Sequence, residues 1–182
     1  MSALENEVSR FSHSDSRSVI RLLNRYGLIL DLAEPGSEIR GSYWGDEEAG
    51  LAGNVLVVRG DTPLHSLLHE ACHFICMDET RRAHLDTNAG GDYDEENAVC
   101  YLQILLADEI PGFGRDKMFR DMDTWGYTFR LGSARSWFEQ DAQEAQQWLL
   151  SSGLITSANK PTFKRYSNPA TGSKWEQTFL PG

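Results

Sequence analysis

A pair of histidines one helical turn apart is the first feature of chemical interest in this sequence. His69 and His73 enclose Glu70 in the pattern HExxH, within "PLHSLLHEACHF" at residues 63–74. Residues four apart share a helix face, so both imidazoles can ligate one Zn²⁺ at about 2.0–2.1 Å. Glu70 is rotated from His69 by about 100°, which places its carboxylate beside the metal. There the carboxylate can act as a general base and take a proton from a zinc-bound water, whose pKa is about 7.

The alternative is a helix that carries partly exposed histidines and no metal. The apolar neighbours of the motif predict a core helix instead; they are Leu64, Leu67, Leu68, Ala71 and Ile75. Buried imidazoles and carboxylates need partners, and we therefore favour zinc. His65 lies on the same face, but three ligands spread over two turns of one straight helix cannot easily converge on one ion. We expect His65 to be solvated or hydrogen-bonded.

A catalytic zinc needs a third protein ligand and an open position. The best source is "DEENAVCYLQILLADEI" at residues 94–110, a second predicted helix. Glu95 shares a face with Ala98, Leu102 and Leu105. Glu96 shares a more polar face with Cys100, Gln103 and Ala107. We therefore expect Glu95 to point inward as the ligand and Glu96 to point toward solvent, with Glu96, Asp92, Asp94 and His84 as alternatives.

The two motifs together resemble a known family. "HEACH" followed by "EENAVCYLQILL" is similar to the gluzincin branch of the zincin metallopeptidases, over about residues 53–107. The layout is closest to short intracellular metallopeptidases of the phage anti-repressor and radiation-response type. The resemblance implies zinc-dependent peptide hydrolysis, Glu95 as a ligand, and an edge strand like "NVLVV" that holds an extended peptide. Val99 stands where those families usually carry Asp or Asn to orient a zinc histidine, so either another group does this or activity is weak.

The remaining elements follow from periodicity and capping residues. We expect helices at 12–27, capped by Ser14 or Asp15, and from Thr62 and Pro63 to about residue 77. Strands are expected at 28–32 and on both sides of the turn "GDEEAG" at 45–50. The connection 78–94 is expected to be a loop, and the helix after it to be capped by Asp94. Further helices are expected at 115–126 and at 133–153, the latter capped by Ser133.

These elements indicate an α+β fold, with a small mixed sheet packed on the active-site helix and further helices, similar to zincins. Residues 1–153 are expected to form a single domain. Residues 154–182 form a polar extension, either packed on the domain or partly disordered.

Composition excludes several classes of function. The net charge of −10 and the pI of about 4.9 disfavour nucleic acid as a partner. No apolar run is long enough for a bilayer, and the first residues do not resemble a secretory signal. The three cysteines, Cys72, Cys76 and Cys100, are expected to be buried thiols rather than a disulfide framework or a metal knuckle. We expect a cytoplasmic protein.

The sequence therefore predicts a zinc metallopeptidase that acts on peptides or proteins, with Glu70 as general base. Tyr127, Tyr93 and His84 are candidates for stabilising the oxyanion, although Tyr127 also fits an ordinary packed aromatic. Two alternatives stay open. One is a catalytically weak or inactive metal-binding or interaction module. The other is a zinc hydrolase that acts on a non-peptide amide.

Overall fold

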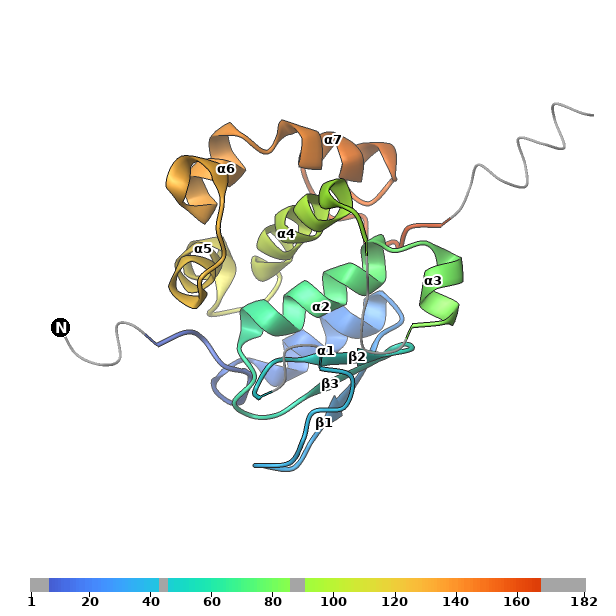
Figure 1. Cartoon of the computed structure of the whole chain (residues 1–182), viewed down its shortest axis with the longest axis vertical. Helices are drawn as coiled ribbons and strands as arrows, with labels where there is room; N and C mark the ends of the chain where they lie inside the picture. Colours follow the sequence, from blue (N-terminus) through green and yellow to red (C-terminus); the bar gives the residue numbers. More distant parts are fainter. Residues whose placement is uncertain (1–6, 43–45, 86–90, 168–182) are drawn as a thin grey trace, which may run out of the picture.

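The protein has an α+β fold in which a small sheet lies at one end of a stack of helices (Figure 1). The computed structural model describes residues 7–42, 46–85 and 91–167. The strands are β1 (Ile29–Leu32), β2 (Gly50–Ala52) and β3 (Val55–Val58). The helices are α1 (Ser16–Arg25), α2 (Leu64–Cys76), α3 (Glu79–Ala83), α4 (Tyr93–Ala107), α5 (Gly114–Trp125), α6 (Ala134–Gln140) and α7 (Gln143–Ser151), with 3₁₀ turns η2 (Phe11–His13) and η3 (Arg130–Gly132).

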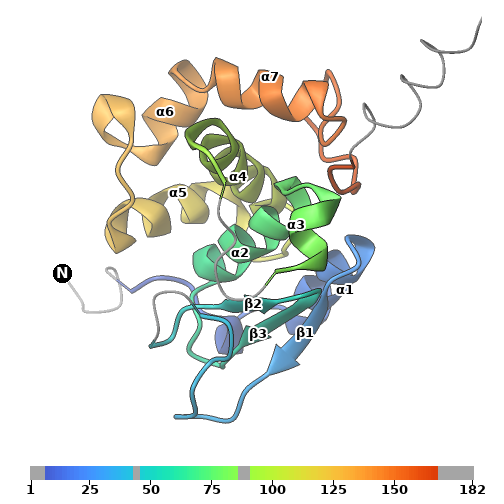
Figure 2. The same cartoon turned by 45° about the vertical axis from the view of Figure 1, so that its right-hand side comes forward.

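The sheet is mixed, as the sequence predicts. β3 is the central strand; it pairs in parallel with β1, with Ile29 opposite Val55, and antiparallel with β2, with Gly50 opposite Val57. β3 contributes buried aliphatic side chains and leads into α2 through a short turn. In Figure 2 the sheet and α1 lie beside α2, α4 lies beyond α2, and α6 and α7 cover the far side. The motif helix is therefore sandwiched between the sheet and α4.

The hairpin before the motif helix differs from the prediction. Strands β2 and β3 are joined at Gly53 and Asn54, not around residues 45–50. Gly53 has φ +60, a conformation that a tight hairpin needs and that glycine adopts without strain. Residues 41–42 are not in a strand, and residues 43–45 of the expected first strand lie outside the described residues.

The starts of α2, α4, α5 and α6 were predicted to within two residues. Asp15 caps α1 and Ser133 caps α6, as expected. Pro63 is the N-cap of α2 rather than its first helical residue, because its ψ of 141 is extended. Thr62 accepts a hydrogen bond from the Arg59 amide instead. The cap of α4 is Asp92, which accepts from the Glu95 amide at 2.9 Å, and not Asp94.

Two further segments differ from the sequence predictions. The connection 78–94, expected to be a loop, contains the one-turn helix α3. The helix expected at 133–153 is divided into α6 and α7 by a break at residues 141–142. Beyond Gly153 the chain continues to pack: Leu154 and Ile155 are buried, and the Tyr166 amide donates to the Ile75 carbonyl at 2.8 Å. Residues 168–182 of the expected extension lie outside the described part.

Helix α4 occupies the centre of the core. It packs against α2, α5 and α7, so that side chains on every face of its last three turns are buried. These buried residues run without interruption from Ala98 to Ala107. Within the described residues, no helix is long and apolar enough to cross a membrane.

Candidate metal site

Helices α2 and α4 bring a carboxylate between the two motif histidines. Glu96 Oε1 lies 3.0 Å from His69 Nε2, and Glu96 Oε2 lies 3.0 Å from His73 Nε2. The two Nε2 atoms are 3.2 Å apart. In a tetrahedral zinc site with bonds of about 2.0–2.1 Å, neighbouring donor atoms are about 3.3 Å apart. The three side chains therefore fit the donor set and the spacing of a zinc site.

Glu95 does not join this cluster, contrary to expectation. It is buried, as predicted, but its carboxylate accepts two hydrogen bonds from the Arg81 guanidinium, at 2.7 and 2.9 Å. Arg81 belongs to α3, the helix that the sequence did not predict. An inward-pointing carboxylate was thus satisfied by an arginine on a neighbouring element rather than by a metal.

The polar stripe of α4 faces α2 and not solvent. Glu96, Cys100 and Gln103 are spaced by four and three residues, so they share one helix face. This face meets the histidines because α4 is enclosed by other helices and has no broad face toward water. The expectation that Glu96 points to solvent is met in part: its side chain is 46% exposed, but its carboxylate turns to the two histidines.

Gln103 fixes the orientation of the first histidine, a contact that the sequence analysis missed. Its Oε1 lies 2.7 Å from His69 Nδ1, and its Nε2 donates to the carbonyl of His65 at 3.3 Å. Since the amide nitrogen is turned to that carbonyl, Oε1 must accept a proton from His69 Nδ1. This leaves His69 Nε2 free to bind a metal, and such outer contacts commonly tune metal sites. Gln103 thus supplies the orienting group missing at Val99.

The ionisable groups of the site have shifted acidities. Burial opposes the ionisation of Glu96, but when no metal is bound and the imidazoles are protonated, hydrogen bonds from His69 and His73 outweigh burial and hold the Glu96 pKa well below its usual range. Burial raises the pKa of Glu70, and the two histidines only partly oppose this rise. A glutamate with a raised pKa is a better proton acceptor, as a general base requires.

Two aromatic side chains and His65 form a second polar group behind the site. His65 Nδ1 lies 3.1 Å from the Tyr127 hydroxyl, and its ring packs against Trp125 with centroids 4.9 Å apart. The Tyr127 ring also meets the His69 ring edge-on at 5.8 Å. His65 is therefore a buried, hydrogen-bonded histidine, as expected, and not a ligand of the cluster.

Of the oxyanion candidates, Tyr127 alone lies against the motif histidines among the described contacts. Tyr93 is 71% exposed at the start of α4, and His84 is exposed at the end of α3. Tyr127 is held by its contact with His65, and burial raises the pKa of its hydroxyl well above the usual range. A hydroxyl that stays protonated can act as a hydrogen-bond donor near the site.

Cys100 places a sulfur atom beside two of these donors, His69 and Glu96. A nitrogen of His69, an oxygen of Glu96 and the sulfur of Cys100 all lie within 4.8 Å of one another. This group could hold a metal ion. From the sequence, Cys100 was expected to be a buried thiol without a link to the motif, although its position four residues after Glu96 places both on one face.

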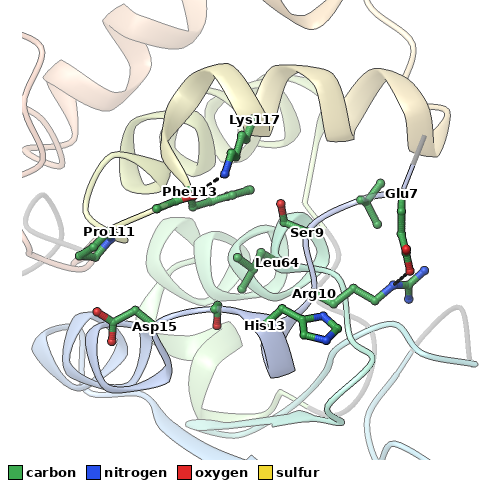
Figure 3. Close-up of a pocket in the computed structure, with 12 residues that line it drawn as sticks. Glu7, Ser9, Arg10, His13, Asp15, Leu64, Pro111, Phe113 and Lys117 are labelled. Carbon is green, nitrogen blue, oxygen red and sulfur yellow. Dashed lines mark hydrogen bonds and ion pairs between the residues drawn. The ribbon is translucent and has the colours of Figure 1, made fainter. Parts of the chain in front are cut away.

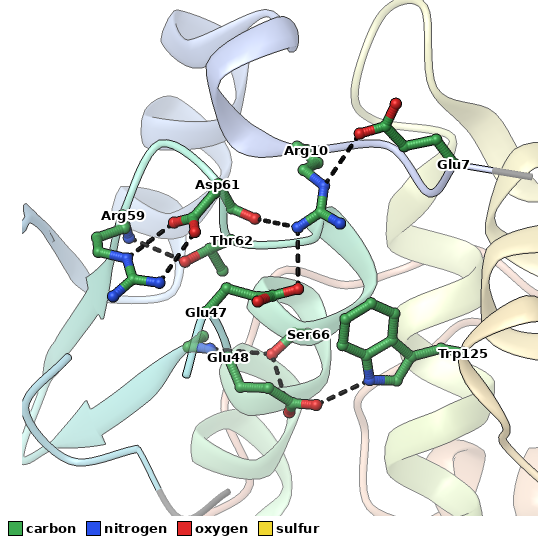
Figure 4. Close-up of polar contacts among 10 residues, drawn as sticks. Glu7, Arg10, Glu47, Glu48, Arg59, Asp61, Thr62, Ser66 and Trp125 are labelled. Carbon is green, nitrogen blue, oxygen red and sulfur yellow. Dashed lines mark hydrogen bonds and ion pairs between the residues drawn. The ribbon is translucent and has the colours of Figure 1, made fainter. Parts of the chain in front are cut away.

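Acidic residues in the loop before β2 contact the start of α2 and the end of α5. Glu48 accepts hydrogen bonds from the Trp125 indole at 2.8 Å and from Ser66 at 3.4 Å (Figure 4). Nearby, Arg10 pairs with Glu47 at 3.1 Å. The loop, α2 and α5 are thereby tied together around the start of the motif helix.

A separate cavity of about 260 Å³ lies between the N-terminal segment and the start of α5 (Figure 3). It is lined by Arg10, His13, Phe113 and Lys117 among others, and Lys117 donates to the Gly112 carbonyl at 2.7 Å. Its lining residues come from a different region than the Glu96 cluster, so it does not form part of the metal site.

Comparisons of the chain with models of protein families, with curated proteins and with solved structures find no match. The function of the site must therefore be judged from its own residues and geometry.

Proposed function

We propose that this protein is a zinc-dependent metallopeptidase in which His69, His73 and Glu96 hold the ion. The observation that carries the proposal is the Glu96 carboxylate, which spans both Nε2 atoms at 3.0 Å. The proposed ligand is Glu96 and not Glu95, but the pattern of two histidines and a glutamate from a following helix is unchanged. The resemblance to gluzincins and the small mixed sheet beside the motif helix support a zincin-like fold.

Glu70 is the proposed general base. A zinc ion in such a site supplies Lewis acidity, which lowers the pKa of water to about 7 and polarises a carbonyl group. Glu70 follows His69 on α2 and, with its raised pKa, accepts the proton of the attacking water and returns it to the leaving amine. Gln103 keeps His69 in the correct tautomer, and the Tyr127 hydroxyl is the proposed donor to the oxyanion.

The proposed substrate is a peptide or protein, and the proposed compartment is the cytoplasm. The substrate class rests on the family resemblance. The compartment rests on the three cysteines, which are free and buried, as suits a reducing environment. The alternative of an inactive metal-binding module predicts the same metal content but no turnover.

Metal content and turnover test the proposal separately. Elemental mass spectrometry is applied to the wild type, to Glu96→Gln and to the matched control Glu95→Gln. We expect about one zinc per chain in the wild type and the control, and loss of most of it in Glu96→Gln. Absence of zinc from the wild type after incubation with the metal would refute the metal site.

Turnover is then measured with an unbiased peptide library and zinc-loaded protein. We expect cleavage by the wild type and its loss in Glu70→Gln, with zinc retained, because this change removes the base and not a ligand. Zinc without any cleavage by the wild type would favour the inactive module or a non-peptide amide substrate.

A further inference from the structure

Cys100 lies beside two of the candidate metal ligands. Cys100 follows Glu96 by one turn of α4, and its sulfur lies within 4.8 Å of a nitrogen of His69. It is 7% exposed, whereas Cys72 and Cys76 are 0% and 1% exposed and lie on α2. Among the three thiols, Cys100 is the one grouped with possible metal ligands within the described residues.

The chemistry of the four donors favours a closed site. Thiolate, imidazole and carboxylate are all zinc ligands, and four protein ligands are typical of structural rather than catalytic zinc. In a tetrahedral site a sulfur lies about 3.6 Å from a nitrogen or oxygen donor, given Zn–S bonds of about 2.3 Å. The observed group of His69, Glu96 and Cys100 spans up to 4.8 Å and does not include His73. Because Glu96 Oε1 already lies 3.0 Å from His69 Nε2, coordination requires the sulfur to move closer to these two atoms.

We propose that the Cys100 thiolate is a fourth, displaceable ligand that occupies the open position, so that a substrate must compete with it and turnover by the zinc-loaded protein is slowed rather than abolished. This inference rests on the proposed function. Coordination forms one sulfur–zinc bond, displaces one water molecule and releases the thiol proton to solvent. Breaking that bond restores the water and the position that a substrate carbonyl needs.

Cobalt substitution tests the ligand directly. Metal-free wild type, Cys100→Ala and the control Cys72→Ala are titrated with Co²⁺ and monitored by absorption. We expect about one bound cobalt in each protein, an intense thiolate-to-cobalt charge-transfer band in the wild type and in Cys72→Ala, and no such band in Cys100→Ala. Circular dichroism shows whether the variants are folded.

A wild type that binds cobalt without the band, or a band that persists in Cys100→Ala, would overturn the inference and leave the metal site standing. Failure of the wild type to bind cobalt would overturn both. Alkylation of the wild type provides a measurement that needs no variant. We expect zinc to slow the modification of Cys100 by iodoacetamide at least about tenfold, as mapped by peptide mass spectrometry, and a chelator to restore it. An equal rate with and without zinc would also overturn the inference.

Discussion

Burial of His65 should make the folded protein sensitive to mild acid. The side chain is 1% exposed, and its Nε2 has no hydrogen-bond partner within the described residues. Burial lowers the pKa of His65 from 6.5 to about 3. The folded protein therefore keeps this imidazole neutral at pH values where the unfolded chain protonates it.

The sign and size of the effect follow from proton linkage. Above pH 6.5 the imidazole is neutral in both states and has no effect on stability. As the pH falls from 6.5 toward 3, the unfolded state binds a proton that the folded state does not, so the free energy of unfolding decreases. With these two pKa values, the loss between pH 7 and pH 5 is about 2 kcal/mol.

Urea unfolding of metal-free wild type and His65→Asn at pH 7 and pH 5 measures this loss. The side-chain amide of asparagine can still hydrogen-bond the Tyr127 hydroxyl but does not titrate. The remaining titratable groups, including His69 and His73, are common to both proteins, so their contributions largely cancel. We expect the wild type to lose about 2 kcal/mol more than the variant. Equal losses in the two proteins would refute a buried, neutral His65.

Three further changes test separate parts of the structure. Gln103→Leu removes the acceptor for His69 Nδ1–H, and we expect zinc affinity to fall about 10- to 100-fold in chelator competition, whereas an unchanged affinity would exclude an orienting contact. Glu95→Gln weakens the pair with Arg81. We expect the free energy of unfolding in urea to fall by about 1–3 kcal/mol while zinc is retained. A parallel loss of zinc would show that Glu95 is a metal ligand. Leu102→Ala empties a fully buried position of α4, and we expect a loss of about 2–5 kcal/mol by the same assay; a loss below about 1 kcal/mol would contradict its place in the core.

Local signals in the sequence were sufficient to predict the helices that begin with a strong N-cap. Asp15 and Ser133 mark helix starts because their side chains satisfy free amides of the first turn. The break at residues 141–142 carried no comparable signal, since neither glycine nor proline interrupts the apolar pattern there. Helix α3 was missed because its five residues are all polar or small, and none is buried.

The glutamate that meets the histidines could not be chosen from helix periodicity, because periodicity identifies a buried face only when the opposite face is exposed to solvent. α4 packs against α2, α5 and α7, so an apolar stripe does not identify the direction of the site. Both glutamates point toward protein, one to Arg81 and the other to the histidines. A better signal was available in the stripe of Glu96, Cys100 and Gln103, because three polar groups on one face of a buried helix need a polar neighbour.

The hydrogen bonds around Gln103 give a physical reason for a cation in this cluster. The His65 carbonyl orients the Gln103 amide, and the amide oxygen takes the proton of His69 Nδ1. His69 Nε2 then carries a lone pair unless the ring is doubly protonated. His69 Nε2 lies 3.0 Å from Glu96 Oε1 and 3.2 Å from His73 Nε2. Electron-rich atoms therefore face one another. A proton can relieve one of these contacts at a time, whereas a divalent ion bound by all three groups relieves them together.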